Sequence, residues 1–213
     1  MKKKYGLKTI DCSGMSYNGY RWDLSEGAVN TAPDWSTDSH CGGGLHFALN
    51  GNGDGSLFRW DSNVIWVVAE LQGQIINLCG KVKCKSCKIV YAGNREDATN
   101  KIKILTGSHS VIGSTNTGGD VSTNSGGDWS TNTGGDRSTN TGGNWSTFKA
   151  GSWGRCHCYG AQCYWIVEEG TIFTMSWYDN ERPKFAGLIG KKKYHGKKVK
   201  IIKGEIVGGI NGI

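Results

Sequence analysis

Two groups of cysteines have spacings that could hold a zinc ion. The first lies in a C-x4-C-x2-C segment, whose last pair, Cys84 and Cys87, has the two-residue gap of zinc sites built on a short turn. The second is the segment CHCYGAQC, residues 156–163. Because structural zinc takes four ligands, one prediction joins Cys84 and Cys87 to Cys158 and Cys163. The alternative is that all of these cysteines are ordinary buried or exposed thiols.

The segment NGNGDGSLFRWD, residues 50–61, matches part of a calcium-loop pattern. The matching positions are Asn50, Asn52, Asp54, Gly55, Leu57 and Asp61. Calcium prefers several carboxylates, whereas this segment offers two, and no helix is indicated on either side of it. The alternative is a loop rich in glycine and asparagine between two strands.

A third candidate site lies in the N-terminal part of the chain. The segment GLHF is followed by a predicted strand that contains Glu70. This arrangement resembles ADP-ribosyltransferase-like folds, in which a strand after a glycine turn lines a nucleotide cleft and a glutamate orients a ribose hydroxyl. The resemblance implies His46 and Glu70 as catalytic residues, although the third motif of such folds is missing. No serine–histidine–aspartate set or phosphate-binding loop is present, so no motif names a reaction.

Residues 113–147 repeat the phrase x-S-T-N-T-G-G-D four times and begin it a fifth time. The STNT part alternates like a short strand, and GGD is typical of a turn. One octad is too short to close a coil around side chains, whereas two octads give a coil of two strands and two turns. Stacked coils of this kind pair as parallel strands about 4.8 Å apart, which predicts a thin β-solenoid with sixteen-residue coils.

The decay of the repeat after Trp145 indicates which side chains point inward. The asparagine position holds, in order, Asn116, Asn124, Asn132, Asn140, Phe148, Cys156 and Tyr164. The threonine positions come to hold Lys149, Arg155 and His157. Apolar residues replace asparagine and charged residues replace threonine, so we expect asparagine inside and threonine outside. The last octad fits less well, because its threonine positions hold Cys163 and Trp165.

The sixteen-residue period also places aromatic residues one coil apart. Trp129 and Trp145 are predicted to stack, and Arg137 and Trp153 are predicted to form a cation–π pair. The alternative is a disordered linker, because flexible linkers use the same glycine, serine, threonine and asparagine residues. A linker, however, has no physical reason to space its aromatic residues in this way.

The G-x-x-S-T-x-T phrase of residues 113–147 resembles the octapeptide of bacterial ice-nucleation proteins. The resemblance implies a solenoid with rows of outward threonines on each side. One side would carry Thr115, Thr117, Thr131, Thr133 and Thr147, and the other would carry Thr123, Thr139 and Thr141. The first row, with Trp129 and Trp145, is the predicted binding surface. The chain departs from that family in having few coils and asparagine at the inward position.

The motifs GGLH, GDGSL, GKVK and AGNREDAT lie within residues 41–102. Through them the segment resembles an uncharacterised domain of phage and actinobacterial proteins, which often precedes similar octads and a short β-rich C-terminal segment. The resemblance implies a phage or mobile-element setting and no particular reaction.

The net charge of +7 comes mainly from two segments, MKKKYGLK and GKKKYHGKKVKIIKG. A basic tail can contact nucleic acid, although a solvated lysine-rich hairpin is the simpler interpretation. No apolar stretch follows the first lysines, and no run reaches the ~20 apolar residues that a membrane helix needs. We therefore expect a protein of a bacterial cytoplasm or of a virion, without membrane contact, whose cysteines are reduced thiols or metal ligands rather than a disulfide framework.

The chain is predicted to be mainly β, with three parts. Residues 1–104 form a small α+β head, residues 105–167 the solenoid, and residues 168–213 a basic, β-rich cap. The one convincing helix starts in NREDATNKI, with Asn94 as its N-cap.

These features favour a non-enzymatic binding or structural protein that uses the solenoid as a rigid spacer and binding face. Its partner would be another protein or a second copy of the chain, although the flat side could also meet a glycan or ordered water. It needs no cofactor beyond the zinc or calcium considered above. One alternative is a nucleotide-binding or ADP-ribosyltransferase-like enzyme with its site in the head. Another is a nucleic-acid binder that uses the lysine-rich tail.

Overall fold

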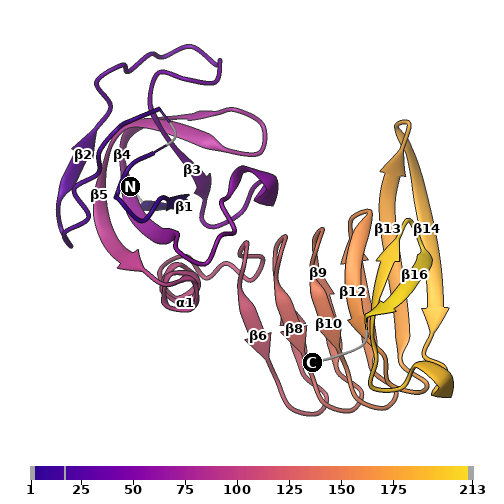
Figure 1. The fold of residues 1–213 in the computed structure, drawn as a ribbon. Helices are drawn as coiled ribbons and strands as arrows, with labels where there is room; N and C mark the ends of the chain where they lie inside the picture. Colours follow the sequence, from indigo (N-terminus) through magenta and orange to yellow (C-terminus); the bar gives the residue numbers. More distant parts are fainter. Residues whose placement is uncertain (1–2, 17, 211–213) are drawn as a thin grey trace. The chain divides into compact units, whose positions relative to one another are not determined.

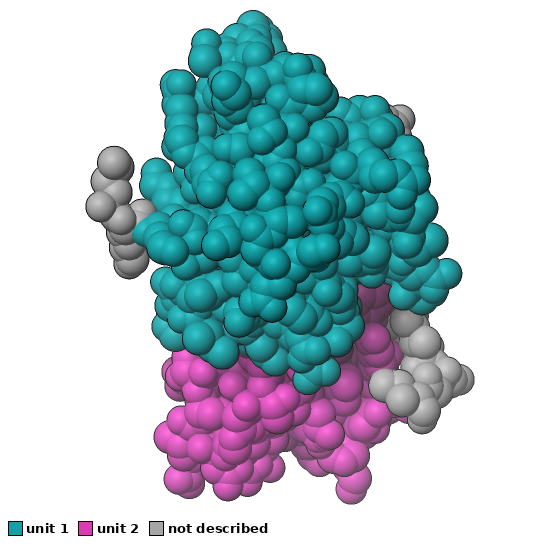
Figure 2. Space-filling model, turned by 90° about the vertical axis from the view of Figure 1, so that its left-hand side faces the viewer, with its two compact units in different colours: residues 1–112 teal, residues 113–213 magenta. Residues whose placement is uncertain are grey.

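The computed structural model describes residues 3–16 and 18–210. It separates into two compact units, residues 1–112 and 113–213, which Figure 2 shows in different colours. Residues 105–112, which the sequence assigned to the solenoid, belong to the first unit, where Val111 and Ile112 are buried in its core.

The first unit is built on an antiparallel sheet of five strands in the order β2-β5-β3-β1-β4. The strands are β1 (Lys4–Ile10), β2 (Val29–Thr31), β3 (Leu45–Leu49), β4 (Ile65–Asn77) and β5 (Val82–Gly93). An additional pairing between β4 and β5 closes the sheet on itself, so that it curls around a core, as Figure 1 shows. Trp22, Phe47 and Val67 lie in this enclosed core.

Helix α1 (Arg95–Thr106) covers the outer side of the same sheet and begins where the sequence predicts. The Asn94 side chain accepts a hydrogen bond from the Asp97 amide at 2.9 Å, which is the predicted N-cap. Gly107 ends the helix with a φ of 69°, a conformation that glycine adopts at little cost. Ala98 and Ile102 pack with Leu7 and Trp66 in a second core.

The second unit is a parallel β-solenoid of about four turns whose strands alternate between two sheets (Figure 1). The first sheet holds β6 (Thr115–Thr117), β8 (Thr131–Thr133), β10 (Thr147–Lys149) and β12 (Gln162–Ile166). The second holds β7 (Thr123–Ser125), β9 (Thr139–Gly142), β11 (Arg155–Tyr159) and β13 (Ile172–Asp179). Thr115 pairs with Thr131, and Thr131 with Thr147, so the predicted sixteen-residue coil is confirmed.

Antiparallel strands close the solenoid at its C-terminal end. β14 (Arg182–Ile189) pairs with β13, β15 (Lys198–Ile202) pairs with β12, and β16 (Glu205–Ile210) pairs with β15. The parallel pattern itself continues through β13, beyond the predicted end of the solenoid at residue 167. The C-terminal part is β-rich, as expected.

Hydrogen bonds between inward asparagines run along the stack. The Asn116 Nδ2 donates to the Asn132 Oδ1, and the Asn124 Nδ2 donates to the Asn140 Oδ1, each at 2.8 Å. Asn132 and Asn140 are fully buried, whereas the neighbouring threonines are partly or fully exposed. The predicted inward asparagines and outward threonines are therefore confirmed in the regular coils.

Each GGD turn is bound to the turn one coil further along. The Asp120 Oδ1 accepts from the Asp136 amide at 2.8 Å, and the Asp128 Oδ1 accepts from the Asn144 amide at 2.9 Å. A Cβ on the second glycine of the turn would overlap the carboxylate of the preceding coil, as at Gly135 beside Asp120. The close approach of the aspartate carboxylate to the turn of the next coil therefore requires both the aspartate and the second glycine of the repeated octad.

The prediction that Tyr164 points inward is wrong. Phe148 pairs with Trp165, which lies seventeen positions on, rather than with Tyr164. One extra residue in the turn between β11 and β12 shifts β12 by one position, and a one-residue shift exchanges the two faces of a strand. Cys163 and Trp165 are therefore buried, and Tyr164 is partly exposed on the outer side.

We expect Asn132→Asp to lower the free energy of unfolding by at least about 3 kcal/mol, because it places an unpaired charge in a fully buried position. Thr131→Asp, the adjacent outward position, should change it by less than about 1 kcal/mol. Urea unfolding of both variants measures the difference. Equal losses would contradict the assigned orientation of the strand.

Candidate functional site

The outward residues of β6, β8 and β10 form a flat surface that we call the threonine face. It comprises Thr115, Thr117, Thr131, Thr133 and Thr147, the residues predicted from the sequence. The parallel register places them in two straight columns, one starting at Thr115 and the other at Thr117. Within the described part of the chain, the hydroxyls of Thr131, Thr133 and Thr147 make no hydrogen bond to a side chain, so they are available to an external group.

The opposite face, on the second sheet, uses more of its polar groups internally. The Thr141 hydroxyl donates to the Ser125 hydroxyl at 2.9 Å. The His157 ring lies 2.6 Å from the Thr174 hydroxyl through Nδ1 and 3.2 Å from the Ser176 hydroxyl through Nε2. Because these groups bond to one another, the threonine face is the better candidate for contact with a partner.

Two lysines of the basic tail lie on the threonine face. β15 pairs with β12 so that Lys200 is opposite Tyr164. The Lys198 Nζ lies 4.8 Å from the centre of the Tyr164 ring, and the Lys200 Nζ lies 5.1 Å from the Trp145 ring. Both are cation–π distances, so the face ends in a group of aromatic rings covered by ammonium groups. From the sequence, the lysine-rich tail and the threonine face were expected to be separate surfaces. The pairing of β15 with β12 places them on the same sheet.

The predicted stacking of Trp129 and Trp145 is confirmed. Their ring centres are 5.3 Å apart, and the ring planes differ by 14°. The predicted cation–π pair of Arg137 and Trp153 is wrong, since the described residues show no such contact. These two side chains instead line one shallow hollow with Arg155 and Ile172.

The first residue of each octad adopts a left-handed conformation, which the sequence analysis missed. The φ angles lie between 54° and 60° at Val121, Trp129, Arg137, Trp145 and Trp153. Glycine adopts this conformation readily, whereas a residue with a Cβ, and above all a β-branched one, does so at a cost. The available signal was Gly113, the first residue of the first octad, which has the same conformation with a φ of 71°.

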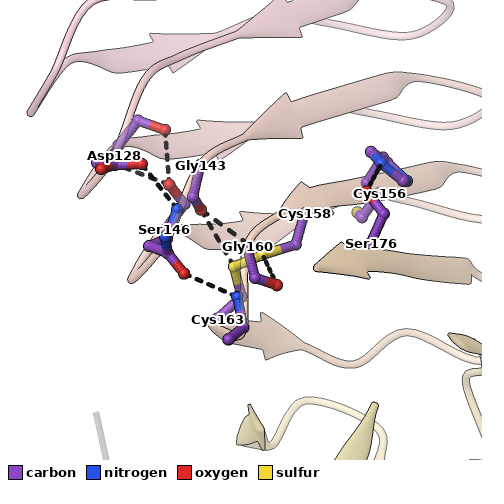
Figure 3. The surroundings of a disulfide bond; sticks show 12 residues. Asp128, Gly143, Ser146, Cys156, Cys158, Gly160, Cys163 and Ser176 are labelled. Carbon is purple, nitrogen blue, oxygen red and sulfur yellow. Dashed lines mark hydrogen bonds between the residues drawn. A yellow bond between two sulfur atoms is a disulfide. The ribbon is translucent and has the colours of Figure 1, made fainter. Parts of the chain in front are cut away.

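A disulfide joins Cys158 in β11 to Cys163 in β12, as Figure 3 shows. In a regular turn these places hold a glycine and a serine, such as Gly142 and Ser146, and a Cβ on Gly142 would lie 2.9 Å from the Ser146 Oγ. Two larger side chains fit the irregular turn because it is one residue longer. The expectation that the cysteines are reduced is therefore wrong for this pair.

The four-cysteine zinc site is also not formed. Cys158 and Cys163 are bonded to each other, and Cys84 and Cys87 are fully buried in the core of the first unit. Burial raises the pKa of both Cys84 and Cys87 to about 12, so these thiols stay protonated, whereas zinc binds the thiolate. Among residues 3–16 and 18–210, no three His, Cys, Asp or Glu side chains gather in a way that could hold a metal ion.

The segment 50–61 is a loop with a short 3-10 helix, η1 (Gly55–Leu57), rather than a calcium loop. The Asp54 Oδ1 accepts hydrogen bonds from the amide and the hydroxyl of Ser56, at 2.9 and 2.6 Å. The Asn52 side chain donates to the Ser108 hydroxyl at 2.9 Å. The proposed ligands are thus occupied in shaping the turn.

His46 and Glu70 do not form one site. His46 lies on β3 and lines a cavity of the first unit, where burial and the charges of Lys81, Lys8 and Lys83 lower its pKa to about 4. Glu70 lies on β4, is absent from the lining of that cavity, and accepts a hydrogen bond from the Lys3 ammonium at 2.8 Å. The pair that an ADP-ribosyltransferase-like cleft would need is not brought together.

Comparisons with protein-family models, with curated proteins and with solved structures give no match for this chain. The resemblances to the phage-associated domain and to the ice-nucleation octapeptide therefore stay predictions. Within the described residues, no helix is long and apolar enough to cross a membrane. The fold alone defines the class of protein, a short β-solenoid joined to a small α+β unit.

The left-handed turn residues generate a stability prediction. Val121→Gly should raise the free energy of unfolding by up to about 1 kcal/mol, because Val121 is exposed and the strain it relieves slightly exceeds the entropy that glycine adds to the unfolded chain. Trp129→Gly should be less favourable by roughly 0.5–1.5 kcal/mol, the contribution of the stack on Trp145. Urea unfolding measures both variants, and a clear loss of stability in Val121→Gly would contradict the strain.

Proposed function

We propose that this chain is a non-enzymatic binding and structural protein, in which the solenoid is a rigid spacer and the threonine face is the contact surface. The observation that carries this proposal is the division of polar groups between the two sides of each strand. Inward asparagines are hydrogen-bonded along the stack, while the outward hydroxyls of Thr131, Thr133 and Thr147 make no hydrogen bond to a side chain of the described residues and can meet an external partner.

The rigidity of the spacer follows from bonds between successive coils. Parallel strand pairing, the asparagine hydrogen bonds and the aspartate contacts to the next turn all link residues sixteen positions apart. Bending the solenoid would have to break several of these bonds together. A partner therefore meets a surface whose hydroxyls are already in place, which reduces the entropy lost on binding.

The proposed partner is another protein or a second copy of this chain. The threonine face is accompanied by the partly exposed, stacked indoles of Trp129 and Trp145, and tryptophan is common at the energetic centre of protein interfaces. The proposed setting is a phage or another mobile element, within a bacterial cytoplasm or on a virion. Its support is the resemblance of residues 41–102 to the phage-associated domain.

Replacing four threonines with lysine tests the contact surface. We expect Thr115→Lys, Thr117→Lys, Thr131→Lys and Thr133→Lys, combined in one variant, to abolish self-association and partner capture, because adjacent like charges repel and block the face. The matched control places lysine at the equivalent positions of the opposite face: Thr123, Ser125, Thr139 and Thr141. Sedimentation velocity and pull-down assays compare both variants with the parent.

A second control neutralises Lys191, Lys192 and Lys193, which lie at η2 (Lys192–Tyr194) and outside the strands of the face. This variant should behave like the parent, because exposed single charges contribute little. If it loses the partner while the threonine variant keeps it, the basic tail is the working surface and the proposal is wrong.

Nucleic-acid binding is a second candidate function, favoured by the lysines over aromatic rings at Tyr164 and Trp145. Single-stranded nucleic acid is bound without sequence preference by aromatic platforms combined with positive charge. We expect Lys198→Gln with Lys200→Gln to weaken binding of a single-stranded oligonucleotide and to reduce the slope of log K against log salt by about 1.4. Fluorescence anisotropy measures both, and an unchanged slope would exclude these lysines as phosphate contacts.

A further inference from the structure

The first unit contains a cavity of about 440 Å³ at a gap in its sheet. β1 and β3 pair only at Gly6–Leu49 and Leu7–Ala48, so the strands separate beyond Leu7. The cavity occupies this gap, and its walls include the aromatic residues Trp22, Phe47 and Phe58. Its volume lies in the range of sites that bind small molecules.

An ammonium group without an anionic partner stands in this cavity. The Lys8 Nζ lies 4.1 Å from the centre of the Trp22 ring and 5.5 Å from the Phe47 ring. Within the described part of the chain, Lys8 forms no ion pair and no side-chain hydrogen bond. Lys8 as a whole is half-buried, and burial of its ammonium group beside the aromatic rings lowers its pKa to about 8.

Lys83, on strand β5 of the same sheet, is a second lysine of this unit, and its role is structural. Its ammonium group is fully buried and donates at 3.0 Å to the Asp38 carboxylate and to the carbonyl oxygens of His40 and Gly42. These bonds fix the loop that carries Cys41 and Gly42 to the sheet, so one wall of the cavity is held in place. Lys8 has no such set of acceptors.

Two further polar side chains of the cavity, His46 and Lys81, favour an anion, whereas two carboxylates, Asp34 and Asp54, also line it, and the Asp54 carboxylate accepts hydrogen bonds from Ser56. The His46 Nε2 accepts a hydrogen bond from the Gly42 amide at 3.4 Å, so the neutral ring carries its proton on Nδ1 and can donate. The Lys81 ammonium lies 2.9 Å from the Cys41 sulfur. Positive charge, a neutral donor and aromatic surface thus meet in one enclosure.

We propose that this cavity binds a small organic anion, with its carboxylate or phosphate on Lys8 and a flat, apolar body against Trp22, Phe47 and Phe58. The anion would supply the partner that Lys8 lacks, and the aromatic rings would enclose the remainder of the ligand. This site belongs to the first unit and is independent of the threonine face.

Calorimetric titration of the full chain tests the chemistry with four probes: 2-naphthoate, 2-naphthyl phosphate, the neutral 2-naphthamide and inorganic phosphate. We expect the two naphthyl anions to bind at least tenfold more tightly than the amide, and inorganic phosphate to bind weakly because it lacks the apolar body. The better of the two anions distinguishes a carboxylate ligand from a phosphate ester. Equal affinity for the anions and the amide would overturn the proposal, as would no binding of the naphthyl probes at millimolar concentration.

The Lys8→Met variant assigns the anion contact. It should lose at least tenfold in affinity for the naphthyl anions and keep its affinity for the amide. Lys4→Met, at an exposed position of the same strand, is the matched control and should match the parent. Unchanged anion affinity in Lys8→Met, or a loss seen only in Lys81→Met, would overturn the assignment.

The pH dependence of naphthoate affinity is a second test of the role of Lys8. Affinity for naphthoate should be level below pH 8 and fall above it, because Lys8 of the free protein then loses its proton. His46 is already neutral in this range, and the nearby thiols of Cys84 and Cys87 stay protonated and uncharged, so neither group changes its charge near pH 8. Lys81, Asp34 and Asp54 also line the cavity, so Lys8→Met is titrated in parallel and should show no fall near pH 8.

Discussion

The solenoid depends on hydrogen bonds between asparagine side chains one coil apart. A buried amide without partners destabilises a fold by a few kcal/mol, so each inward asparagine requires a hydrogen-bond partner inside the stack. The bonds from Asn116 to Asn132 and from Asn124 to Asn140 satisfy this requirement. They also hold the register, and the register decides which residues of every octad face outward.

The polar ladder is replaced by an apolar core towards the C-terminal end. Phe148, Cys156, Trp165 and Phe173 continue the inward positions that asparagine holds earlier. Dispersion and burial do not require identical partners in successive coils, so this part tolerates an added residue in a turn and a change from parallel to antiparallel pairing. The irregular features of the unit, including its disulfide, are found where the ladder has ended.

The features that could be predicted are those that recur with the eight-residue or sixteen-residue period of the sequence. The coil length, the inward asparagines, the outward threonines and the stacked Trp129 and Trp145 all follow from spacing. The orientation of Tyr164 was indicated only weakly, by Cys163 and Trp165 at the threonine positions of its octad, because one added residue leaves no mark in composition. The pairing of Cys158 with Cys163, and the cavity beside Lys8, depend on how separate segments meet in space. The spacing of Arg137 and Trp153 was correct, but spacing alone does not set side-chain direction.

The alternation of strands between two sheets limits how a gene for this chain could change in length. Loss or gain of one octad by recombination between its repeated codons would send every later strand to the opposite sheet. Trp145 would leave the column of Trp129, and the closing strands would meet the wrong neighbours. Loss or gain of two octads would preserve every column. Related genes should therefore differ by even numbers of octads. The number of coils in the threonine face should then vary, while the columns of residues on it stay the same.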